Sequence, residues 1–79
     1  MLRKNNFEII FSRHAFIRAM QRGIGPDIIE VTVNTGKMRH FGKNRVKFEK
    51  RFRKFTIICV DEKIGEMIKI VTIVKKERL

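Results

Sequence analysis

Apolar positions follow two different spacings along this chain, and the spacing changes near residue 36. Between residues 13 and 35 they recur every three or four positions, which is typical of amphipathic helices. From residue 37 onward they alternate with polar positions or form short β-branched runs, which is typical of strands. A short apolar stretch at residues 8–11 also has the composition of a strand. The predicted order is therefore strand, helix, helix and then three or four strands.

Local signals mark the ends of both predicted helices. Ser12 can accept a hydrogen bond from a free first-turn amide, so the first helix should begin at about Arg13. Gly23 can take the left-handed conformation that ends a helix. Pro26 suits the first position of the second helix, because its missing N–H costs nothing there. This second helix should stop at Thr35-Gly36.

Each predicted helix has one apolar side, which we expect to face the core. On the first helix this side carries Phe16, Ile17 and Met20, with Ile24 just beyond. On the second helix it carries Ile28, Ile29, Thr32 and Val33. The strands that follow are predicted at residues 37–41, 45–53, 54–61 and 66–74, with turns at 42–44 and 61–65.

Strands grouped after helices favour an α+β fold with a mostly antiparallel sheet. We expect both helices to pack on one face of that sheet, and the last strand, rich in Ile and Val, to be central. A chain of 79 residues is long enough for a single domain, residues 1–79.

The charge is strongly basic, with 19 Lys and Arg against 8 Asp and Glu, a net +11. It is densest in residues 37–55, where Glu49 is the only acidic residue. Such a concentration attracts polyanions, and nucleic acid is the first candidate partner. The alternative is that basic residues on an edge strand discourage aggregation. The candidate nucleic-acid-binding residues are Arg45, Lys47, Arg51 and Arg53.

Several classes of protein find no support in the sequence. One cysteine, Cys59, excludes an internal disulfide, and no apolar run approaches the ~20 residues of a membrane helix. The start of the chain lacks the cleavage site of a secretory leader. A cytoplasmic protein without membrane contact is the simplest inference. No paired-cysteine or His-Glu-x-x-His pattern and no glycine-rich phosphate loop is present, so no metal or cofactor is predicted.

Candidate chemistry lies on the first helix, where His14, Arg18 and Arg22 stand at i, i+4 and i+8 on the side away from Phe16. They are either a solvated outer face or an anion site, because Arg binds phosphate through two parallel hydrogen bonds and His exchanges protons near neutral pH. Metal-free RNA cleavage needs a proton acceptor, a proton donor and cations. His14, His40 and the arginines include such groups. A protein that binds nucleic acid without cleaving it could use the same kinds of residues.

The first helix and its flanks resemble the opening of a family of small uncharacterised bacterial and archaeal domains, similar to the RelE/ParE and BrnT toxins of toxin–antitoxin modules. The residues that carry the resemblance are Phe11-Ser12, His14-Ala15, Arg18, Met20 and Arg22-Gly23-Ile24. The resemblance implies a RelE/ParE-like fold and a toxin-like, metal-independent endoribonuclease or translation inhibitor acting on RNA, including RNA on the ribosome.

By the same resemblance, His14, Arg18 and Arg22 are the catalytic residues, and a small acidic antitoxin is a partner. Related members often end the last strand with a tyrosine, whereas this chain contains none, and ParE-like relatives are not ribonucleases. The alternative is a non-catalytic, basic nucleic-acid-binding or protein-interaction module on the same fold.

Overall fold

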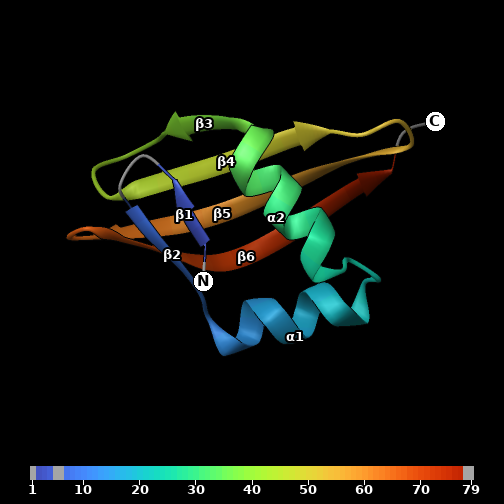
Figure 1. Ribbon diagram of the computed structural model, residues 1–79, viewed down its shortest axis with the longest axis horizontal. Coiled ribbons are helices and arrows are strands. Elements are labelled where there is room, and N and C mark those ends of the chain that lie inside the picture. The colour runs from blue at the N-terminus through green and yellow to red at the C-terminus, as the bar shows by residue number, and fades with distance from the viewer. Residues whose placement is uncertain (1, 5–6, 78–79) are drawn as a thin grey trace.

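Two helices and six strands form in the computed structural model, which describes residues 2–4 and 7–77 (Figure 1). The elements are β1 (Leu2–Lys4), β2 (Phe7–Phe11), α1 (Arg13–Gln21), α2 (Pro26–Thr35), β3 (Lys37–His40), β4 (Arg45–Arg51), β5 (Phe55–Ile64) and β6 (Met67–Glu77). The predicted α+β class and the order of the two helices and the four strands after them are confirmed. Strand β1 was not predicted.

The local signals for the helices hold in the structure. Ser12 caps α1, and its side-chain oxygen accepts a hydrogen bond from the Ala15 amide at 3.0 Å. Gly23, with φ at +72°, follows the last turn of α1. Pro26 is the first residue of α2, which ends at Thr35 as predicted. These ends could be predicted because capping involves residues that are near neighbours in the sequence.

The strands form one mixed sheet in the order β1-β2-β6-β5-β4-β3. Strands β3 to β6 pair antiparallel in succession, as predicted, and β1 pairs antiparallel with β2. The pairing of β2 with β6 is parallel, so β6 lies between β2 and β5. The turn predicted at residues 61–65 is present, but it begins later than predicted. β5 continues to Ile64, and the chain reverses at Gly65, whose φ is +59°.

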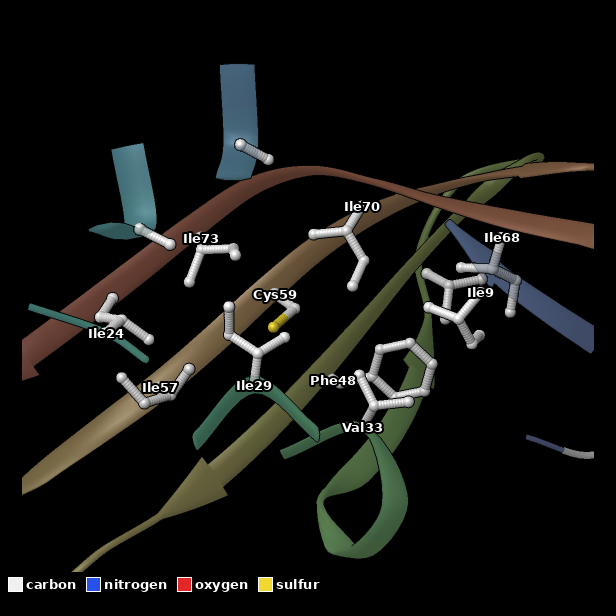
Figure 2. Close-up of a cluster of buried hydrophobic side chains, with 13 residues drawn as sticks. Ile9, Ile24, Ile29, Val33, Phe48, Ile57, Cys59, Ile68, Ile70 and Ile73 are labelled. Atoms are coloured by element: carbon white, nitrogen blue, oxygen red, sulfur yellow. The ribbon is translucent and has the colours of Figure 1, made fainter. Parts of the chain in front are cut away.

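The core lies between the helices and one face of the sheet (Figure 2). The sheet contributes Ile9, Val46, Phe48, Ile57, Cys59, Ile68, Ile70 and Ile73, and the helical segment contributes Ala15, Ala19, Ile24, Ile29 and Val33. Figure 1 shows α2 crossing β4 and β5, while α1 runs along β6. The prediction that both helices pack on one face is therefore confirmed. We call the opposite side of the sheet, whose residues alternate with these core positions, the open face.

The predicted apolar side of α1 is wrong for its helical residues, whereas Ile24, just beyond the helix, is buried as predicted. Phe16, Ile17 and Met20 are 43%, 45% and 39% exposed, whereas Ala15 and Ala19 are buried. Small side chains let the backbone of α1 approach β6 closely, which larger side chains would prevent. This orientation turns the side that carries the predicted site residues toward β6 rather than away from the sheet.

Two substitutions test this orientation of α1. Ala19→Leu should lower the free energy of unfolding by ~1–3 kcal/mol, because added volume has no room in a packed interface. Met20→Ala should change it by no more than about 0.5 kcal/mol, because the methionine is largely exposed. Urea denaturation of both variants measures the difference. A larger loss for Met20→Ala than for Ala19→Leu would mean that α1 packs through its Phe16 side.

A β-bulge interrupts the pairing of β5 with β6 beside α1. Val60 pairs with Thr72, and Asp61 pairs with Ile70, so Val71 is an extra residue in β6. The extra residue shifts the alternation of core-facing and outward-facing side chains along β6, and both Ile70 and Ile73 therefore face the core. Bulges are common next to functional sites, because they redirect side chains at a chosen point of a strand.

Candidate nucleic-acid interface

His14, Arg18 and Arg22 line a groove of about 230 Å³ between α1 and β6. The opposite wall is the bulged part of β6, at Val71–Ile73. The groove exists because β2 pairs with β6 only as far as Ile70, so the continuation of β6 meets a helix instead of another strand. The structure thus brings the three predicted helix residues together on one wall.

His14 and Arg18 are exposed, and neither side chain forms a hydrogen bond or an ion pair within the described part of the chain. His14 lies in the first turn of α1, where the helix has no acidic residue. The partial positive charge of a helix N-terminus favours a nearby anion. The wall of the groove at this end is therefore suited to a negatively charged ligand.

Arg22 has a different place from the other two residues. Its Nη1 donates a hydrogen bond to the Ile73 carbonyl oxygen at 2.7 Å. This carbonyl lies on the edge of β6 that has no partner strand, and the bond joins it to the end of α1. Arg22 therefore positions the groove walls, while its remaining N–H groups can still donate to an anion. A direct catalytic role for Arg22 stays a prediction.

The predicted nucleic-acid-binding residues of β4 lie on the open face. Arg45, Lys47 and Arg51 alternate with the buried Val46 and Phe48. Arg53 lies beyond β4 and is exposed. The four predicted residues are thus all on the surface, and three of them share one face of one strand.

A row of paired residues joins this strand to the groove. Lys47 pairs with Val60 on β5, and Val60 pairs with Thr72 on β6. Thr72 is itself part of the groove wall. Since neighbouring strands lie about 4.8 Å apart, Lys47 is roughly 10 Å from the β6 backbone. Lys47, Val60 and Thr72 therefore lie in one row across the open face, and this row ends at the wall of the α1–β6 groove.

The two histidines do not come together. His14 lies beyond β6, whereas His40 ends β3 at the opposite edge of the sheet. The strands β5 and β4 separate them, so one site cannot use them as an acid–base pair. His40 is exposed and pairs with Val46 across the β3–β4 ladder. Sequence reasoning could not place the histidines, because their separation depends on strand order.

Asp61 is a titratable residue that was predicted to begin a turn, whereas the structure places it inside β5. It is fully buried, and neither carboxyl oxygen has a hydrogen-bond partner among the described residues. Burial raises the pKa of Asp61 to about 8. The continued alternation of Ile57, Cys59 and Asp61 was the signal that places this residue in the core.

Cys59 is a buried thiol that precedes Asp61 on the same face of β5. Burial, and then the charge of Asp61, raise the pKa of Cys59 to about 12. A thiol with such a pKa is almost wholly protonated at neutral pH and is a poor nucleophile. Cys59 therefore contributes packing rather than chemistry.

Among the described residues, no three of His, Cys, Asp and Glu lie together as ligands for a metal ion. No helix in the same part of the chain has the length and apolar character needed to cross a membrane. Comparison with protein-family models, with curated proteins and with solved structures finds no match to this chain.

Proposed function

We propose that this protein binds single-stranded RNA along the α1–β6 groove and the open face, and acts as a toxin-like inhibitor of translation. The observation that carries the proposal is the exposed pair His14 and Arg18 in a groove that leads, through Thr72 and Val60, to Lys47. Arg contacts phosphate through a planar fork, and Lys adds a point charge along the backbone. The sequence resemblance of α1 to toxin domains supports the same proposal.

The balance of charge supports a polyanionic partner. The chain carries a net +11, and the single ion pair found in its described part joins Lys75 to Glu77 at 3.5 Å. Most basic side chains are therefore uncompensated by acidic ones. Binding a polyanion releases its condensed counterions and relieves the repulsion among these charges. A small acidic antitoxin would cover the same surface by the same attraction.

The shape favours a single strand over a duplex. A helix that reads duplex DNA enters the major groove with its contact side free. In α1 the side that carries His14 and Arg18 is turned toward β6, with Val71–Ile73 opposite. A flexible single strand can place its backbone between these two walls, whereas the wide cylinder of a duplex cannot.

RNA cleavage is the second candidate, and the position of His14 beside Arg18 favours it. In this proposal His14 takes the proton of the attacking 2′-hydroxyl as its oxygen bonds to phosphorus, and it returns that proton to the 5′-oxygen that leaves. Arg18 holds the scissile phosphate. Arg22 keeps both walls in place through its bond to Ile73. Among the described residues that line the groove there is no carboxylate, so we propose a reaction that proceeds in the presence of EDTA. A protein that only binds RNA is the non-catalytic alternative.

Salt dependence tests the binding proposal. If five phosphates are contacted on a single strand, log K should fall with log salt at a slope of about −3.5, roughly 0.7 for each contact. Fluorescence anisotropy with a labelled single-stranded RNA, at salt concentrations from about 50 to 200 mM, measures this slope. Lys47→Gln should reduce its magnitude by about 0.7 if that lysine contacts one phosphate.

The control is Lys43→Gln, which removes the same charge from an exposed turn. It should leave the slope close to that of the wild type, because Lys43 lies outside the groove and outside the row that ends at Lys47. The proposal is wrong if the wild type does not bind RNA at the lowest salt, or if the Lys47 and Lys43 variants have the same slope.

A further inference from the structure

A second cavity, of about 410 Å³, lies where α2 ends and β3 begins. It is separate from the α1–β6 groove, because β3 and β4 are at the opposite edge of the sheet from α1. Its volume falls within the 300–1,000 Å³ of typical small-molecule sites. The lining residues are Thr35, Gly36, Lys37, Arg39, Glu49, Lys50 and Arg51.

The backbone around Gly36 builds this cavity. The Gly36 amide donates to the Thr32 carbonyl oxygen at 2.9 Å, which ends α2. A Cβ at this position would clash with that oxygen and would come within 2.8 Å of the Glu49 carbonyl oxygen. Only glycine therefore lets the chain pass so close to β4. Pairing of β3 begins one residue later, opposite Glu49, and the end of β4 remains open beside the cavity.

Four cationic side chains converge on this cavity from two strands. Lys37, Arg39 and Arg51 come from the open face, and Lys50 comes from the opposite side of β4. Glu49 is the only acidic residue in the lining, which gives the lining a formal charge of +3. No ion pair joins Glu49 to these cations in the described part of the chain. Bringing like charges together is unfavourable unless an anion compensates them.

The C-terminal end of α2 disfavours anion binding, but its partial charge is smaller than the charge of the cationic side chains. A helix C-terminus carries a partial charge of about −0.5 on its free carbonyl groups. Here the Thr32 carbonyl accepts from the Gly36 amide, and the Val31 carbonyl accepts from the Thr35 hydroxyl at 2.8 Å. These bonds satisfy two of the terminal carbonyls. The net field inside the cavity is therefore positive, because the four cations outweigh both Glu49 and the end of α2.

We propose that this cavity binds a phosphate-bearing ligand of nucleotide size. Arg39 and Arg51 can each hold a phosphate through two parallel hydrogen bonds, and Lys37 and Lys50 add charge from the two sides of the sheet. The ligand is a free nucleotide or the phosphorylated end of an RNA chain, because both present the same phosphate chemistry. The site does not depend on RNA binding in the α1–β6 groove.

Isothermal titration calorimetry with ADP and with adenosine, at low salt, tests the proposal. The wild type should bind ADP and not adenosine. Arg51→Gln and Lys50→Gln should each weaken ADP binding about tenfold or more, as expected for loss of a charge-assisted hydrogen bond. Glu49→Gln should tighten it, because it removes the one negative charge. Lys43→Gln, in the exposed turn between β3 and β4, is the charge-matched control and should bind like the wild type.

Short RNAs with and without a 5′-phosphate separate the two sources of the ligand. Tighter binding of the RNA that carries the 5′-phosphate than of the same RNA without it assigns the cavity to an RNA end. Equal binding of the two RNAs, together with binding of ADP, assigns it to a free nucleotide. His14→Ala should bind ADP like the wild type, so failure of the groove proposal is distinguished from failure of this one. Equal affinity for ADP and adenosine overturns the inference. The inference is also overturned if Arg51→Gln and Lys43→Gln bind ADP with the same affinity while circular dichroism shows that both variants are folded.

Discussion

Asp61→Asn should make the folded state more stable at neutral and alkaline pH, by on the order of 3–5 kcal/mol near pH 8. The carboxyl of Asp61 is fully buried, and both oxygens lack hydrogen-bond partners in the described structure. Its strand neighbours across the sheet are Val46 and Ile70, which offer no donor side chain. Ionising the group inside this apolar setting is costly, and burial raises its pKa to about 8.

The sign of the pH effect follows from this raised pKa. In the unfolded chain Asp61 loses its proton near its ordinary pKa of 3.8, whereas the folded protein holds the proton to about pH 8. Between these values the folded state binds more protons, so stability falls as pH rises. The contribution of the protonated group is fully present below pH 3.8 and is lost by the time the pH passes about 8. Asparagine cannot ionise, and its variant should lack this decline.

Urea unfolding from about pH 5 to about pH 9 measures the difference. The wild type and Asp61→Asn should be closest at the acidic end and should diverge with increasing pH. Glu62→Gln is the matched control, since it makes the same acid-to-amide change at the next residue, which is exposed. Its stability should parallel that of the wild type. A constant difference between Asp61→Asn and the wild type across this range would show that Asp61 is ionised, or partnered, in the folded state.

The boundaries of both helices could be predicted, but the buried side of α1 could not. Ser12 and Gly23 act on groups within a few residues, so their effect is visible in the local sequence. The buried side depends instead on the distance between α1 and β6, which only the assembled fold defines. Ala15 and Ala19 permit a close approach, while the larger Phe16 remains outside. Counting apolar residues on a helix favours the wrong side when the contact needs small side chains.

The turn after β5 shows a second limit of sequence reasoning. Charged residues from Asp61 to Lys63 have a turn-like composition, but Gly65 makes the turn. Lys63 is still in the strand, and its Nζ lies 5.0 Å from the centre of the Phe7 ring. The parallel pairing of β2 with β6 also left no local signal, because it joins segments about 60 residues apart.

The candidate site was predicted in part for the same reason. The i, i+4, i+8 spacing places His14, Arg18 and Arg22 on one side of α1, and the structure brings them into one groove. The opposite wall of the groove contains the bulge at Val71 and the Ile73 carbonyl. Its position depends on strand order and register. The cationic cavity beside Gly36 was missed because its members come from separate segments that meet only in the folded sheet.

His14→Ala should fold normally and lose RNA cleavage by ~10²–10⁴, if His14 carries the proton in the proposed reaction. The side chain is exposed and has no partner in the described structure, so its removal should change stability by no more than about 0.5 kcal/mol. His40→Ala is the matched control, because His40 is exposed at the far edge of the sheet. It should cleave RNA like the wild type. The assay uses purified protein, single-stranded RNA and EDTA.

Arg18→Lys separates bidentate phosphate contact from simple attraction of charge. The substitution keeps the positive charge in the groove but removes the planar fork, so cleavage should fall while RNA binding at low salt is largely kept. Full cleavage by His14→Ala would exclude that residue as the proton carrier. A wild type that binds RNA with the expected salt slope and never cleaves it would favour the non-catalytic alternative, because His14 is the one histidine among the described residues that line the groove.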